Sequence, residues 1–315
     1  MIDMRVLVFA AVVTVAAAGA ASAAADGLPV LGVDVGTQGV TVPASASRYV
    51  TIDQGGSTLV ERIARNGGKV LGLMTLNGTF TIPAVAYDSS AGGLSADGRT
   101  LVLIQPRRSF PRRETTFALL DARILRVRRT FTLHGDFSFD AVSPGGRTMF
   151  LINYTSPDPT RYAVRAYDLR ASRLRPAPIT DPAEHSDKMR GSPITRLASA
   201  DGRWAYTLYD GGGAAPFVHA LDTATARAHC IDLDFLSGRG NVWQLRLRAG
   251  GDGGLTVVSS GGPVARVDLA TFAAAPPPAP DERDLRPWLV LGAALAASAL
   301  AVLAGRAVRR RPATA

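Results

Sequence analysis

The stretch LSADGRTLVLIQ at Leu94–Gln105 is nearly repeated at two later places in the chain. The two echoes are VSPGGRTMFLIN at Val142–Asn153 and ASADGRWAYTLY at Ala198–Tyr209. Each combines an Asp-Gly or Gly-Gly pair and an arginine with a following apolar, β-rich run. Because glycine accepts a positive φ at no steric cost, such a pair between two strands marks a tight hairpin turn. The motif therefore predicts that the same hairpin is built several times along the chain.

A second marker, an apolar run that ends in aspartate, lags behind the turns. It occurs at Asp121, Asp168, Asp222 and Asp268. Both markers recur at a period of about 50 residues, which indicates a repeated supersecondary unit. One unit contains the four short strands FSFDAVS, RTMFLINYT, YAVRAYDLR and RLRPAPI. Short strands with frequent turns predict antiparallel β-structure, and four strands per unit is the composition of a propeller blade.

The turns SADGRT, SPGGRT and SADGRW resemble the blade turns of YVTN/WD40-like bacterial β-propellers, which include the surface-antigen and lactonase-like groups. The resemblance covers residues 28–272 and implies an all-β propeller, whereas it leaves the function open. We expect five four-stranded blades, the first of them degenerate at Val40–Asp53. The fifth blade lacks a fourth strand in the sequence, so Leu28–Val35 is predicted to supply it and close the ring. A sixth blade would require two further strands within 77–92.

Both ends of the chain carry membrane signals. Arg5, the apolar run Val6–Ala20 and the small-residue pattern at Ala21–Ala23 predict a signal peptide over 1–25. An uncleaved N-terminal anchor is the alternative. Near the other end, the uncharged run Trp288–Gly305 is long enough to cross a hydrocarbon layer of about 30 Å as a helix. Four arginines follow it at once, so the positive-inside rule places the short tail in the cytoplasm.

These signals predict a single-pass protein of the cell membrane with an extracellular N-terminal domain. The expected divisions are a signal peptide at 1–25, a β-propeller domain at 26–272, a proline-rich linker at 273–286, a transmembrane helix at 287–305 and a basic tail at 306–315.

The composition narrows the function classes. The formal net charge is +9, and the single cysteine, Cys230, excludes an intramolecular disulfide. Nucleic acid is not expected as a partner of a domain outside the cell that lacks aromatics among its basic residues. The sequence contains no phosphate-binding glycine loop, no G-x-S-x-G and no H-E-x-x-H, so it predicts no cofactor, no metal and no catalytic residue.

The long connectors are expected to gather at one end of the propeller, where binding usually takes place. In each blade the short turns join the first strand to the second and the third to the fourth, so the remaining, longer connectors share the opposite end. One of them, PRRSFPRRE, is strongly basic and would attract anionic partners, although an arginine-biased surface is the favoured explanation of its charge. Another, DPAEHSDKMR, could hold a divalent metal or be a solvated charged loop. The predicted binding residues are Arg107, Arg108, Arg112, Arg113, Arg161, Asp181, Glu184, His185, Asp187, Arg190 and Asp210.

Two function classes remain open at this point. The first is a non-catalytic binding or scaffold module, tethered to the membrane, whose partner is a protein, an anionic polymer or a small ligand at the cell surface. The second is a propeller hydrolase, lactonase-like, with a site at the mouth of the axial channel. The candidates for such chemistry are His134, Asp136 and Asp140, whereas His219 and Cys230 are expected to be core residues. Apolar residues in the channel would favour the first class, and convergent ionisable groups would favour the second.

Overall fold

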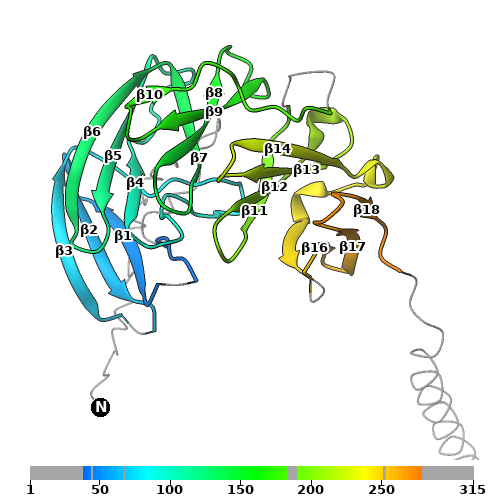
Figure 1. Ribbon diagram of the computed structural model, residues 1–315, viewed down its shortest axis with the longest axis horizontal. Helices are drawn as coiled ribbons and strands as arrows, with labels where there is room; N and C mark the ends of the chain where they lie inside the picture. The colour runs from blue at the N-terminus through cyan, green and yellow to red at the C-terminus, as the bar shows by residue number, and fades with distance from the viewer. Residues whose placement is uncertain (1–37, 44, 67, 184–189, 251–252, 279–315) are drawn as a thin grey trace, which may run out of the picture.

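A computed structural model describes residues 38–43, 45–66, 68–183, 190–250 and 253–278 of this chain. These residues form five antiparallel sheets, numbered 1 to 5 in chain order, which follow one another around a common centre (Figure 1). Sheet 1 contains β1 (Ser47–Asp53), β2 (Ser57–Ala64) and β3 (Val70–Asn77), and sheet 2 contains β4 (Thr100–Ile104), β5 (Glu114–Asp121) and β6 (Arg126–His134). Sheet 3 contains β7 (Asp136–Val142), β8 (Thr148–Tyr154), β9 (Tyr162–Asp168) and β10 (Arg173–Leu174).

Sheets 4 and 5 complete the series. Sheet 4 contains β11 (Pro193–Ala198), β12 (Trp204–Tyr209), β13 (Phe217–Asp222) and β14 (Arg227–Asp232). Sheet 5 contains β15 (Arg246–Ala249), β16 (Leu255–Ser259), β17 (Gly262–Val267) and β18 (Ala274–Ala275). Three single-turn 3-10 helices lie in the connectors: η1 (Gly211–Gly213), η2 (Asp234–Leu236) and η3 (Val242–Gln244).

The repeated turn motif works the same way in sheets 2 and 4, and in sheet 3 the Ser143 hydroxyl likewise accepts from the Thr148 amide at 3.0 Å. In sheet 2 the Ser95 hydroxyl accepts from the Thr100 amide at 3.0 Å and donates to Asp97 at 2.6 Å. Gly98 then reverses the chain with a φ of 66°. The turn of sheet 4 repeats this arrangement with Ser199, Asp201 and Gly202. Local side-chain hydrogen bonds and one left-handed glycine therefore explain why the sequence repeats, and the predicted repeated hairpin is confirmed.

The aspartate that ends each apolar run caps the next turn. The Asp168 carboxylate accepts from the backbone amides of Arg170 and Ala171, at 2.9 and 2.8 Å. Asp121, Asp222 and Asp268 make the equivalent pairs of bonds. The second marker is thus an Asx turn at the end of β5, β9, β13 and β17, each of which pairs directly with the strand that follows the first marker, and this explains its constant lag behind the first.

The prediction of four strands in every blade is wrong for sheets 1 and 2. Their innermost strand is reduced to isolated bridges, Val40 to Tyr49 in sheet 1, and Thr81 to Ile104 and Leu94 to Leu101 in sheet 2. Between the two bridges of sheet 2 the chain passes through Pro83, which has no N–H to donate to a ladder, and turns away from β4. The irregular segment therefore replaces regular pairing with contacts to other sheets.

The prediction for the last blade also needs correction. Sheet 5 has a fourth strand of its own, because β18 pairs with Arg266 and Val267 of β17. This strand lies within 273–286, the stretch expected to be linker. Two alanines carry no strand signal, which is why the sequence did not reveal it. Leu28–Val35, predicted to occupy this position, lies outside the described residues.

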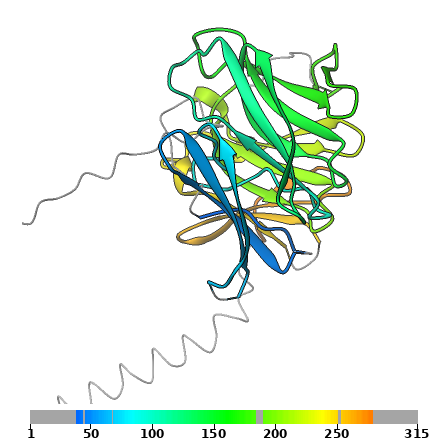
Figure 2. The ribbon, with the colours of Figure 1, turned by 90° about the vertical axis from the view of Figure 1, so that its left-hand side faces the viewer.

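Four clusters of buried side chains join neighbouring sheets. They pack sheet 1 on sheet 2, sheet 2 on sheet 3, sheet 3 on sheet 4 and sheet 4 on sheet 5. Figure 2 views the molecule from the side on which sheet 1 lies, so that sheet 1 is nearest to the viewer. Within the described ranges, no such cluster joins sheet 5 to sheet 1. The core is therefore a continuous series of sheet-on-sheet interfaces.

No helix among the described residues is long and apolar enough to span a membrane. The predicted signal peptide at 1–25, the transmembrane run Trp288–Gly305 and the basic tail at 306–315 all lie outside the described ranges.

Candidate functional site: the loop-rich end

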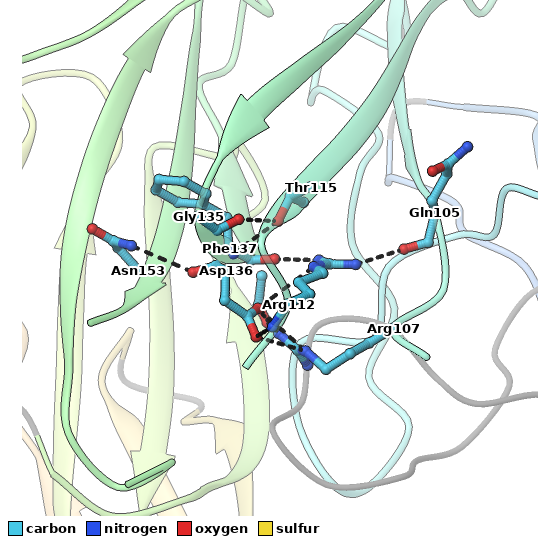
Figure 3. Close-up of polar contacts among 9 residues, drawn as sticks. Gln105, Arg107, Arg112, Thr115, Gly135, Asp136, Phe137 and Asn153 are labelled. Atoms are coloured by element: carbon cyan, nitrogen blue, oxygen red, sulfur yellow. Dashed lines mark hydrogen bonds and ion pairs between the residues drawn. The ribbon is translucent and has the colours of Figure 1, made fainter. Parts of the chain in front are cut away.

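The basic connector between β4 and β5 is organised around one buried carboxylate, that of Asp136 (Figure 3). Asp136 begins β7 and is 1% exposed. Arg107 donates to it from Nη2 at 2.6 Å, and the backbone amide of Arg112 donates to its second oxygen at 2.9 Å. Arg107 also donates to the hydroxyl of Ser138 at 2.9 Å. The carboxylate is therefore fully engaged, and it ties the connector of sheet 2 to the inner strand of sheet 3.

Arg112 fixes the same connector in a second way. Its guanidinium donates to the carbonyl oxygens of Gln105, at 2.9 Å, and Phe137. Its Nε lies 3.5 Å from Asp136. The side chains of Arg107 and Arg112 are only 6% and 8% exposed. Breaking a buried ion pair typically costs about 3–5 kcal/mol, so these two arginines contribute to stability.

The four arginines of this connector, all named as candidate binding residues, lie in two different environments. Arg108 and Arg113 are exposed, whereas Arg107 and Arg112 are buried. Arg107 also packs against two rings, with its guanidinium carbon 5.3 Å from the centre of Tyr154. Burial raises the pKa of the Tyr154 hydroxyl, which keeps it neutral and able to donate.

A polar hollow of about 310 Å³ opens beside this connector. It is lined by Thr79, Gln105, Pro106, Arg108, Ser109, Arg112, Glu114 and Thr116. The lining residues carry three hydroxyls, one side-chain amide, two guanidinium groups and a single carboxylate, that of Glu114, which lies 3.1 Å from Nδ1 of His134. Arginine is suited to binding carboxylates and phosphates in a fork geometry. The hollow can therefore accept an anionic group, with hydroxyls and an amide available for the rest of a ligand.

The other predicted residues hold the neighbouring connectors. Asp210 accepts from the amides of Ser192 at 2.7 Å and Gly212 at 3.0 Å, which joins the connector before β11 to the one after β12. Asp181 is 8% exposed and accepts from the backbone amide of Cys230 at 2.7 Å. Both carboxylates therefore stabilise the fold by holding neighbouring segments together.

The remaining predicted residues divide into two groups. Arg161 and Arg190 are exposed. Glu184, His185 and Asp187 lie outside the described residues. In the described part of the chain, no three His, Cys, Asp or Glu side chains are grouped so that they could hold a metal ion.

A chain of ring contacts joins the connectors of sheets 2, 3 and 4. Phe110 lies 5.4 Å from Tyr154, Tyr154 lies 5.8 Å from Tyr162, and Tyr162 lies 6.1 Å from Tyr209, between ring centres. The Tyr162 hydroxyl also donates to the carbonyl of Gly191 at 3.2 Å. These contacts bring the long connectors together at one end of the molecule, which we name the loop-rich end.

The segment 82–90 crosses the interior of the molecule. Ile82, Ala84 and Ala86 have no exposed surface. The amides of Tyr87 and Asp88 donate to the carbonyls of Pro193 and Ile194, the first residues of β11, at 2.9 and 3.2 Å. The segment thus crosses from sheet 2 to sheet 4. The ring centre of Tyr87 lies 5.1 Å from the ring centre of Trp243, which belongs to η3, just before sheet 5. Sequence reasoning missed this segment, whose small apolar residues and proline look like an ordinary loop.

The three residues considered for axial chemistry do not converge. His134 is on the surface with Glu114, Asp136 is held by Arg107, and Asp140 is paired with Arg196 of β11. His219 is a core residue as predicted, 2% exposed, and burial lowers the pKa of its imidazole to about 4. Cys230 is only half-buried.

Five antiparallel sheets that follow one another around a common centre define the described part of this chain as an all-β protein with a β-propeller-like fold. No protein-family model matches the chain, and no curated protein does.

Several solved structures are similar to it at low identity. Hydrazine synthase from Kuenenia stuttgartiensis is 15% identical, with 73% of this chain and 64% of that chain covered and a TM-score of 0.41. The present chain thus spans less than two thirds of that protein. A functionally unknown protein from Desulfotomaculum acetoxidans is 12% identical, with coverage of 76% and 68% and a TM-score of 0.44. TolB from Acinetobacter baumannii is 16% identical, with coverage of 73% and 56% and a TM-score of 0.35. Likenesses at these scores carry no conclusion about function.

Proposed function

We propose that this protein is a non-catalytic binding module at the cell surface, tethered to the membrane, and that its loop-rich end binds an anionic ligand. The observation that carries the proposal is the Asp136 network. It fixes a long connector through two buried arginines and leaves Arg108 exposed at the polar hollow. A site that is held rigid before binding loses less conformational entropy when the ligand arrives.

The pairing of the central carboxylates supports binding over the alternative of a propeller hydrolase. Asp136 and Asp140, the carboxylates of the inner strand β7, are held in separate ion pairs by Arg107 and Arg196. A hydrolase site would instead need a nucleophile or water-activating group within hydrogen-bond reach of a partner base.

The sequence supports the membrane tether. The signal peptide at 1–25, the uncharged run Trp288–Gly305 and the arginines after it agree on one topology. The ligand would then be an anionic polymer, a small anion or an acidic protein surface outside the cell.

Titration of the purified full chain with polyglutamate tests the binding proposal. Arg108→Ala should weaken binding by about tenfold, because a charge-assisted hydrogen bond is worth about 1.5–3 kcal/mol before solvent screening reduces it. The matched control is Arg126→Ala, which removes the same charge from the exposed first residue of β6, outside the hollow. Equal losses in both variants would show that net charge alone attracts the polymer, and the proposed site would be wrong.

A further inference from the structure

A second hollow, of about 150 Å³, opens at the other end of the molecule, beside the repeated turns. The inner edges of sheets 1 to 4 surround it, and its walls are mostly apolar. Those walls include Val42, Val85, Leu94, Phe139, Ala198 and Trp204. We name it the axial hollow. Val85, Phe139 and Asp140 also line a hollow of only about 10 Å³ on their other side, so they form the wall that separates the axial hollow from the loop-rich end.

One buried ion pair lies in this apolar wall. Arg196 of β11 donates from Nη2 to Oδ1 of Asp140 and from Nη1 to the Asp140 carbonyl oxygen at 2.9 Å. The side chains are 9% and 3% exposed. Oδ2 of Asp140 and Nε of Arg196 have no hydrogen-bond partner among the described residues. Buried polar atoms without a hydrogen-bond partner are rare, so one unpaired acceptor and one unpaired donor at the same site call for an explanation.

We infer that the axial hollow binds a small molecule with an apolar, branched body and an amide group. The amide N–H would donate to Oδ2 of Asp140, and the amide oxygen would accept from Nε of Arg196. Both atoms are buried in the unliganded protein, so the Asp140 carboxylate and the Arg196 guanidinium would turn together to present Oδ2 and Nε to the ligand, the carboxylate about its soft terminal torsion. The apolar body would lie against Leu94 and Phe139.

Other ligand chemistries fit these two atoms less well. A ligand carboxylate would accept from Arg196 but would be repelled by Asp140. A ligand ammonium would donate to Asp140 but would leave Nε of Arg196 without an acceptor. An aliphatic molecule fills the walls and leaves both atoms unsatisfied. An amide supplies one donor and one acceptor on two atoms bonded to the same carbon, and it carries no charge, which matches a neutral ion pair in an apolar wall.

This site is independent of the proposed function, because the two hollows lie at opposite ends of the molecule and share no lining residue. Loss of anion binding would therefore leave it untouched. Entry would be from the turn end, past the exposed Thr41 and Pro43.

The first test compares three probes on the wild-type full chain by ligand-observed NMR: isovaleramide, 4-methyl-2-pentanone and isovalerate. The ketone has the shape of the amide but lacks the N–H donor. We expect isovaleramide to bind about tenfold more tightly than the ketone, because a site built to hydrogen-bond a group rejects an analogue without it. Isovalerate should bind no better than the ketone. Equal affinities for amide and ketone, or no saturable amide binding, would overturn the inference.

Two variants locate the binding. Asp140→Asn removes the repulsion and should shift the preference from isovaleramide towards isovalerate. Val42→Trp should narrow the hollow and weaken amide binding by about tenfold. Val258→Trp is the matched control, since Val258 is also half-buried but lies on β16, outside the hollow. Unchanged amide binding in Val42→Trp would contradict the assignment even if Asp140→Asn did not fold.

Discussion

Asp136 and Asp140 belong to the same strand, β7, and each carries a buried carboxylate paired with an arginine from another sheet or connector. The two differ in how completely they are satisfied. Asp136 receives Arg107 on one oxygen and the Arg112 amide on the other. Asp140 receives Arg196 on one oxygen only. The comparison suggests that a fully satisfied ion pair holds a site in place, whereas a half-satisfied one has capacity left for a ligand.

The largest expected effect is on the Asp136 side. Asp136→Asn should destabilise the protein by about 3–5 kcal/mol, because it leaves the buried Arg107 without its counter-charge. Urea unfolding of the full chain measures this difference. The double variant Asp136→Asn with Arg107→Met should recover part of the loss, since replacing both partners removes the unpaired charge. A loss below about 1 kcal/mol would show that the network does not hold the connector.

The Asp136 network also shows where sequence reasoning ends. The turns were predictable because Ser95, Asp97 and Gly98 act on one another locally. Asp136 and Arg107 are separated by 29 positions, and which of four arginines meets the carboxylate depends on how two sheets pack. The same holds for β18 and for the segment 82–90, whose pairing is set by neighbouring sheets rather than by their own residues.

A pH-dependent effect is expected on the Asp140 side, where His219 is buried. Its folded-state pKa of about 4 lies below the ordinary value of 6.5, so the unfolded chain binds the extra proton first as the pH falls. Stability should therefore decrease between about pH 6.5 and pH 4, by roughly 3 kcal/mol in total. Unfolding at a series of pH values measures it.

His219→Phe should flatten that part of the pH profile. The control is His134→Gln, which removes an imidazole that is 92% exposed and should leave the slope unchanged. A His219→Phe profile as steep as the wild type would assign the acid sensitivity to other groups.

Asp140→Asn also leaves a buried arginine, Arg196, without its counter-charge, and it should cost about 3 kcal/mol, the lower end of the range expected for Asp136→Asn. One oxygen of Asp140 has no partner to lose, and the remaining amide oxygen can still accept from Arg196. The same urea measurement gives both values side by side. If Asp140→Asn were the more damaging change, the contrast between a satisfied and a half-satisfied pair would be wrong.

The smallest effects concern the repeated turns beside the axial hollow. Gly98→Ala should cost about 1 kcal/mol, because its φ of 66° is strained for alanine although no atom crowds the new Cβ. Gly202→Ala should cost more, since its Cβ would lie 2.5 Å from the Ala96 Cβ. Melting temperatures compare the two. Equal shifts in melting temperature would mean that Gly202, in the turn of sheet 4, does not lie against Ala96, in the turn of sheet 2.

Hydrogen exchange of the full chain, with and without polyglutamate, tests most directly whether anion binding belongs to the loop-rich end. Slower exchange is expected in 105–116, because Arg108, Ser109 and Thr116 line the polar hollow and the connector is already held by Asp136. The turns at 96–99 and 199–203, at the other end, should exchange at the same rate in both conditions. Protection confined to those turns, with none in 105–116, would contradict the account.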